Sequence, residues 1–142
     1  DMAPIEHPMI FDPIRKKEVP LTPEERVRQA VVHLLTHQLG YPPALIANEY
    51  TITVGKLSRR CDTVVFTPQL QPLMILEYKA PHIPLTDKVI QQAFQYNTTL
   101  QVPYIALSNG RQTLLFKVGY QNQPSTPIQG IPPYQQLLQS LR

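Results

Sequence analysis

Proline is the residue that most restricts how this chain can fold. Sixteen of the 142 residues are Pro, about twice the usual share of roughly 5%. Because Pro lacks a backbone N–H and breaks helices from within, a bundle of long helices is disfavoured. The prolines gather in residues 1–20, which also carry Arg15-Lys16-Lys17, and in residues 121–133. We therefore expect an irregular, Pro-rich basic arm over 1–20, a structured domain over 21–120, and a loop with a terminal helix over 121–142 that packs on the same domain.

The rest of the composition is typical of a folded domain. Hydrophobic residues make up 42% and charged residues 16% of the chain, which is enough apolar surface for a core. The single cysteine, Cys61, excludes an internal disulfide and is typical of a reducing compartment. Since no apolar run is long enough to cross a membrane and no secretion signal is present, the expected location is the cytoplasm. A net charge of +3 permits an anionic partner without requiring one.

The hydrophobic pattern predicts an alternation of helices and strands. Thr22-Pro23-Glu24-Glu25 is typical of a helix N-terminus, and Gly40 ends that helix. A second helix is expected at 86–100 and a weak one at 134–141, with strands at 46–54, 60–66, 73–79, 103–108 and 111–118. The order αβββαββ, with the final helix, indicates an α/β (α+β) domain in which helices flank a mixed central sheet of about five strands.

Two of these strands, joined by the turn 67–72, carry the candidate chemistry. A hairpin symmetric about that turn pairs Phe66 with Leu73, Val64 with Ile75, and Asp62 with Glu77. Because side chains alternate along a strand, Asp62, Glu77 and Lys79 share one face, whereas the other face holds Cys61, Thr63, Val65, Met74, Leu76 and Tyr78. Both faces are largely apolar, so this hairpin is expected at the centre of the sheet, covered on both sides.

Asp62 and Glu77 are predicted to be cross-strand neighbours, with Cβ atoms about 4.5–5.5 Å apart. Two carboxylates at this distance repel each other, and the repulsion grows as the dielectric falls. A cation must therefore lie between them, or one of them must hold a proton. Two hard oxygen ligands beside the ammonium group of Lys79 suit Mg²⁺, which completes its shell with water and substrate phosphate.

The residues around this pair resemble a known family. Asp62 followed by Glu77-Tyr78-Lys79 is similar to the signature of the PD-(D/E)xK nucleases. The wider pattern looks like the N-terminal nuclease domain of type I restriction enzyme R subunits, and it includes 59–66, 75–81, Gln92, Tyr96-Asn97, Ser108-Asn109-Gly110, 22–29 and Gly40-Tyr41-Pro42. The resemblance covers about residues 20–118 and implies a restriction-endonuclease-like fold.

The resemblance also implies an activity and roles for individual residues. The chain is expected to be a metal-dependent deoxyribonuclease, an endonuclease domain of a restriction-modification system. Asp62, Glu77 and the carbonyl of Tyr78 would bind Mg²⁺, with Mn²⁺ as a substitute, and Lys79 would orient the attacking water. Gln92 and Tyr96 match the QxxxY motif of this nuclease branch, and Glu25 would approach the metal through water.

The expected partner is DNA, with Lys56, Arg59, Arg60 and Lys88 along its phosphate backbone. Tyr78 departs from the family, which usually has a small residue between Glu and Lys. The chain also lacks the G-x-x-x-x-G-K-[ST] loop of the R-subunit motor, so we expect a stand-alone relative or a fragment, with a motor or specificity subunit acting in trans.

Less specific interpretations remain open at this stage. The domain either cleaves DNA, or keeps the nuclease fold as a catalytically quiet module that binds nucleic acid or protein, or uses Asp62, Glu77 and Lys79 as an internal ion network. Glu25 is also the third residue of a capping box with Thr22, and Arg59 and Arg60 also fit a solvated strand edge. The four His residues lack further zinc ligands and an HExxH pattern, so no zinc site is expected.

Overall fold

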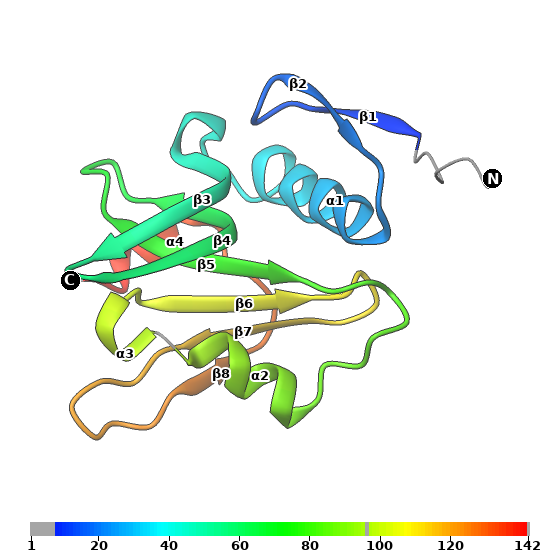
Figure 1. Ribbon diagram of the computed structural model, residues 1–142. Helices are drawn as coiled ribbons and strands as arrows, with labels where there is room; N and C mark the ends of the chain where they lie inside the picture. The colour runs from blue at the N-terminus through cyan, green and yellow to red at the C-terminus, as the bar shows by residue number, and fades with distance from the viewer. Residues whose placement is uncertain (1–7, 96, 142) are drawn as a thin grey trace.

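The computed structural model describes residues 8–95 and 97–141 of the chain (Figure 1). Its centre is a six-stranded sheet in the order β3-β4-β5-β6-β7-β8, in which β5 and β6 run parallel and the other neighbouring pairs are antiparallel. The strands are β3 (Ile46–Val54), β4 (Leu57–Phe66), β5 (Pro72–Tyr78), β6 (Tyr104–Ser108), β7 (Thr113–Lys117) and β8 (Thr126–Ile128). The mixed sheet confirms the expected fold class, with one strand more than predicted.

Helices lie on both faces of this sheet (Figure 1). They are α1 (Pro23–His37), α2 (Asp87–Phe94), α3 (Asn97–Leu100) and α4 (Tyr134–Gln139), with a short 3₁₀ turn at Pro43–Leu45. The first helix begins as predicted, because the hydroxyl of Thr22 accepts the N–H of Glu25 at 3.1 Å. The single helix expected at 86–100 is instead divided into α2 and α3. Every helix within the described residues is too short or too polar to cross a membrane.

The central hairpin of β4 and β5 is buried on both sides, as predicted. Val64 and Ile75 are register partners and are fully buried on the face that α3 covers, together with Leu100. Val65 and Met74 pack on the opposite face against α1 and α4. The register shifts between Val65 and Phe66, so Phe66 faces Pro72 and the predicted pairing with Leu73 is wrong.

The segment that was expected to be an irregular arm forms a second, two-stranded sheet. Its strands are β1 (Met9–Asp12) and β2 (Lys17–Pro20), which pair antiparallel. The carboxylate of Asp12 accepts the backbone N–H groups of Ile14 and Arg15 at 2.8 and 3.2 Å, which closes the turn. Pro13 lies in the turn and Pro20 ends β2, where a missing N–H costs no ladder bond. The expectation of an irregular backbone was therefore wrong for residues 9–20.

The alternation of side chains reverses at one point in β3 and β4. Asn48 pairs with Thr63 and Tyr50 pairs with Cys61, and between these pairs lie Glu49 and Asp62. Glu49 has a left-handed backbone, with φ at 55°, which a residue with a side chain rarely adopts. On one side of this reversal Thr63 faces α1, and on the other side Cys61 packs with Val64 on the opposite face. The predicted face for Cys61 is therefore wrong.

Candidate active site

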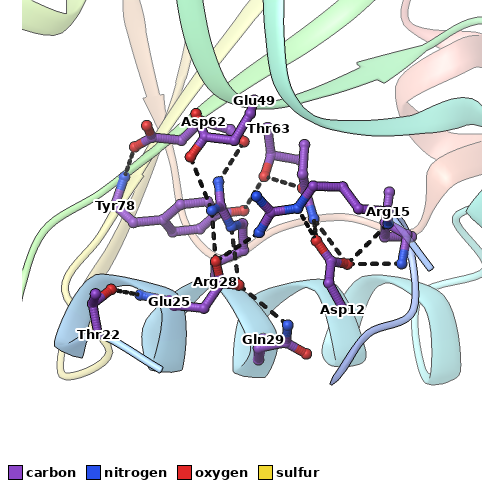
Figure 2. Close-up of polar contacts among 12 residues, drawn as sticks. Asp12, Arg15, Thr22, Glu25, Arg28, Gln29, Glu49, Asp62, Thr63 and Tyr78 are labelled. Carbon is purple, nitrogen blue, oxygen red and sulfur yellow. Dashed lines mark hydrogen bonds and ion pairs between the residues drawn. The ribbon is translucent and has the colours of Figure 1, made fainter. Parts of the chain in front are cut away.

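The β4 and β5 strands stop pairing where the two candidate metal ligands begin. Thr63 and Leu76 are the last register partners, one step before Asp62 and Glu77. Beyond that pair, the side chain of Asp62 replaces the next strand contact, because its Oδ2 accepts the backbone N–H of Tyr78 at 2.8 Å (Figure 2). The site thus lies where two strands separate. The N–H of Tyr78 that would otherwise lack a partner there is satisfied by a side chain rather than by backbone.

Glu77 forms an ion pair with Arg59, a residue that was expected to contact DNA or to lie on a solvated edge. The Nη2 atom of Arg59 lies 2.7 Å from Oε1 of Glu77, and Nη1 donates to the carbonyl of Ala93 in α2 at 2.8 Å. Both side chains are largely buried, with 11% of Arg59 and 16% of Glu77 exposed. The reversal at Glu49 and Asp62 explains the pair, since it places Arg59 on the face of Cys61 and Glu77.

The carboxyl group of Glu77 holds its proton unusually strongly. Burial and the nearby charge of Asp62 raise its pKa from 4.5 to about 8, although Arg59 acts in the opposite direction. The two carboxyl groups are therefore close enough to repel each other. A cation bound near both carboxyl groups would favour their ionised forms and offset this repulsion.

A cavity of about 290 Å³ opens beside Glu77. Its lining residues are Arg59, Arg60, Glu77, Lys79, Val89, Gln92, Ala93 and Leu107. It therefore brings together Glu77 and Lys79 from the end of β5 with Gln92 from α2. Gln92 is exposed and Lys79 is half-buried, so both can meet a ligand from solvent.

Asp62 lines a different and smaller cavity, of about 160 Å³, on the side of α1. The residues around it are Thr22, Glu24, Glu25, Arg28, Glu49, Asp62 and Tyr78. The predicted site residues are thus distributed over two cavities, with Asp62 in one and Glu77 in the other. The predicted cross-strand pairing of Asp62 with Glu77 is absent from the strand register, which ends at Thr63 and Leu76.

Glu25 is the centre of a buried polar network (Figure 2). Its carboxylate accepts hydrogen bonds from Arg28 at 2.7 and 3.2 Å, from Arg15 at 2.7 Å and from Gln29 at 3.1 Å. Burial alone would raise the pKa of Glu25, but the hydrogen bond and charge of Arg28, with Gln29 and Arg15, hold it below its ordinary value. The side chain does not complete the capping box, and its water-mediated approach to a metal stays a prediction.

Arg28 and Glu49 also belong to this network, and sequence reasoning missed both. Arg28 is 6% exposed and donates to Glu49 at 3.0 Å and to the backbone carbonyl of Asp62 at 2.8 Å. Its guanidinium also lies 5.9 Å from the ring centroid of Tyr78, within cation–π range. One signal was available in the sequence: Glu49 is the only charged residue in β3.

The remaining predicted residues lie at the edge of the site or away from it. The Tyr78 ring points away from Glu77, and its hydroxyl donates to Thr63 at 2.9 Å. Arg60 is 71% exposed and pairs with Glu49 at 2.9 Å. Lys56, in the turn between β3 and β4, and Lys88, in the first turn of α2, are exposed and line neither cavity. Tyr96 lies outside the described residues.

The donor atoms at the strand ends fit a hard divalent cation better than zinc. Within the described part of the chain, no three His, Cys, Asp or Glu side chains converge on one point. Asp62 and Glu77 could supply two carboxylates, and a cation between them would relieve their mutual repulsion. One or two carboxylates, with water and phosphate completing the shell, is the ligand set of Mg²⁺. Zinc prefers four nitrogen or sulfur ligands.

Comparison with known protein families identifies the family of this chain. The family described as Type I restriction enzyme R protein N terminus (HSDR_N) matches residues 23–132, which is most of the sequence. The chain belongs to this family. The resemblance drawn from the motifs around Asp62 and Glu77 is therefore confirmed. The comparison with curated proteins finds no match.

A solved structure shares the fold of this R-protein N-terminal domain. A fragment from Vibrio vulnificus YJ016, described as an HsdR subunit of a type I restriction enzyme, is 21% identical, with a TM-score of 0.60. The match covers 85% of this chain and 25% of that fragment. The type IIG restriction endonuclease BpuSI is 23% identical over 78% of this chain and 13% of its own, with a TM-score of 0.49. The R-protein N-terminal domain thus spans about a quarter of the HsdR fragment.

Proposed function

We propose that this R-protein N-terminal domain is a metal-dependent endonuclease that hydrolyses phosphodiester bonds in DNA. One observation carries the proposal: burial and the charge of Asp62 raise the pKa of Glu77 to about 8, beside a cavity that Lys79 also lines. Two repelling carboxylates next to a lysine provide a place for a cation and a group that orients water. Membership of the restriction-enzyme family supports the same assignment.

In this proposal Asp62, Glu77 and the carbonyl of Tyr78 hold Mg²⁺, for which Mn²⁺ substitutes. When bound, the ion supplies positive charge that acidifies a water molecule and stabilises negative charge on the phosphate. Lys79 donates a hydrogen bond that orients the water and balances charge on the phosphate oxygens as the transition state forms.

Residues around the metal ligands have supporting roles in the proposal. Gln92 donates to a phosphate oxygen from the helix side of the cavity. Tyr96, which lies outside the described residues, is proposed to act with it. Glu25 acts at a distance, by holding Arg28 on the backbone carbonyl of Asp62.

DNA is the proposed substrate and the main partner. Arg60, Lys56 and Lys88 are exposed cations that can follow the phosphate backbone, a type of contact that gives affinity without sequence specificity. Because the chain spans 25% of the HsdR fragment that it matches, we propose that other parts of a restriction enzyme, including a motor or specificity subunit, bring DNA to this domain.

A specific observation favours a second candidate function. Glu77 already has a cationic partner, Arg59, at 2.7 Å, as an internal ion network would provide. The alternative is therefore a quiet binding module that keeps the nuclease fold. A correctly folded protein that binds no Mn²⁺ in a calorimetric titration would favour this alternative.

The direct test is cleavage of supercoiled plasmid and of single-stranded DNA in Mg²⁺ or Mn²⁺. The wild-type protein should nick at least one substrate, and Lys79→Ala should abolish cleavage while folding normally. Lys117→Ala is the matched control, because it removes an exposed lysine of β7 that lines neither cavity and has no proposed contact with DNA. Cleavage that persists in Lys79→Ala would contradict the proposed role of this lysine.

A further inference from the structure

The ion pair between Arg59 and Glu77 implies a form of regulation that rests on the proposed function. Arg59 uses one nitrogen for Glu77 Oε1, at 2.7 Å, and the other for the carbonyl of Ala93, at 2.8 Å. It therefore connects β4, the end of β5 and α2 at the wall of the cavity. Among the ion pairs of the described residues, Glu77 has Arg59 as its partner rather than Lys79.

A divalent cation at Glu77 must compete with this guanidinium. The arginine is 11% exposed, so water screens its charge poorly, and two cations beside one carboxylate repel strongly in such surroundings. We propose that Arg59 is an exchangeable counter-ion of Glu77: it occupies the carboxylate when DNA is absent and moves to a DNA phosphate when the metal binds.

The geometry of the cavity identifies the phosphate as the group that receives Arg59. The same cavity is lined by Arg59, Lys79 and Gln92, so a phosphate bound there lies within reach of the guanidinium. Arginine matches phosphate oxygens with two parallel N–H donors. A bound phosphate thus replaces Glu77 as the anion for Arg59 and leaves Glu77 for the metal. Metal and DNA then favour each other's binding, reciprocally.

Calorimetric titration of Mn²⁺ into the DNA-free protein tests the competition. Arg59→Gln keeps a hydrogen-bond donor for Ala93 but loses the charge, so we expect it to bind Mn²⁺ at least about fivefold more tightly than wild type. Arg26→Gln is the matched control, since Arg26 is exposed on α1 and lines neither cavity, and the Mn²⁺ affinity of this variant should stay within twofold of wild type. Equal or weaker binding by Arg59→Gln would overturn the proposal.

A second measurement uses the wild-type protein and does not depend on the folding of a variant. Ca²⁺ is titrated with and without a short DNA duplex, and the duplex should raise Ca²⁺ affinity about fivefold or more. An affinity for Ca²⁺ that is the same with and without DNA would overturn the proposal.

Asp62→Asn separates this inference from the proposed function. Mn²⁺ binding that is lost in Asp62→Asn but is not tighter in Arg59→Gln would reject the exchange and keep the metal site. Failure of Mn²⁺ to bind both the wild type and Arg59→Gln would reject the metal site and, with it, the exchange.

Discussion

Arg59 and Glu77 form a buried ion pair, with 2.7 Å between Nη2 and Oε1, where β4 and β5 separate. The pair exists because the alternation of side chains reverses at Glu49 and Asp62. Without the reversal, Arg59 would share the face of Thr63 and lie on the opposite side of the sheet from Glu77. Strained backbone next to a candidate site is a recurrent feature of enzymes, and here it determines which charges meet.

The free energy of unfolding should fall as the pH rises between about 4.5 and 8, measured in EDTA. The folded pKa of Glu77 is about 8, against an ordinary 4.5, so in this window the folded protein keeps a proton that the unfolded chain releases. Stability from such a group is present below the unfolded pKa and is lost as the pH rises through the folded one. The slope should be at most about 1.4 kcal/mol per pH unit, measured by urea unfolding.

Glu77→Gln is the control for this pH dependence. The amide cannot ionise but its oxygen can still accept from Arg59, so the variant should fold at least as stably as wild type at pH 8 and lose the slope. A Glu77→Gln variant that keeps the full slope would show that another group causes the pH dependence, and one that unfolds would favour a structural role for the charged cluster.

Substitution of Asp62 should separate its structural and metal-binding roles. Asp62→Ala removes the acceptor for the Tyr78 N–H and should cost about 1–3 kcal/mol of stability, whereas Asp62→Asn keeps an acceptor and should cost less. Both should lose the metal-dependent stabilisation, which for wild type is about 2.7 kcal/mol at a Mn²⁺ concentration 100 times the dissociation constant. Thermal unfolding with and without Mn²⁺ measures both effects, and an undiminished Mn²⁺ effect in Asp62→Asn would place the metal elsewhere.

Asp12 should make the fold sensitive to acid. Burial opposes ionisation of Asp12, but hydrogen bonds from Arg15 and Asn48 lower its pKa below 3.8. A lowered carboxyl pKa gives stability that is present above the unfolded value and is lost as the pH falls through the folded one. Asp12→Asn should therefore cost about 2 kcal/mol at pH 7, and less below pH 3.8. Glu18→Gln, an exposed change in the same hairpin, should cost under about 0.5 kcal/mol; equal losses in the two variants would contradict this account.

Val64 supports the site by packing alone. It is fully buried beside Ile75, so Val64→Ala should lower the free energy of unfolding by roughly 1–3 kcal/mol through lost burial and a cavity. Val54→Ala, in the exposed part of β3 (40% exposed), should change it by less than about 0.5 kcal/mol. Chemical denaturation of both variants gives the comparison, and similar losses would mean that the core does not extend under the site as described.

Local signals in the sequence were sufficient to predict most of the helices and strands of the domain. The cap at Thr22, the bounds of β3 and the pairing of Val64 with Ile75 each depend on residues close in sequence or on simple alternation. The same alternation failed for Cys61, because the left-handed backbone of Glu49 leaves no trace in the hydrophobic pattern.

Other features depend on contacts between distant residues. The β1–β2 hairpin is held by Asp12, whose carboxylate also accepts from Asn48, 36 positions away in the chain. The prolines at the ends of its strands made the composition of this segment typical of irregular structure, so the hairpin was not predicted. The β8 strand lies within the Pro-rich segment and pairs with β7 at the edge of the sheet. This pairing depends on the position of β7 and not on the local sequence of β8. The Arg59–Glu77 pair could not be predicted, since it requires the reversal at Glu49 and Asp62.

The location of the metal is the most direct test of the central claim. Crystals soaked in Mn²⁺ and measured at the manganese absorption edge give an anomalous difference map that locates each ion without assumptions about its ligands. We predict a peak in contact with the carboxylates of both Asp62 and Glu77, with the carbonyl of Tyr78 as a further ligand and Lys79 beside it. Occupied manganese sites away from these carboxylates, or none in soaked crystals, would contradict the assignment of this R-protein N-terminal domain as a metal-dependent nuclease.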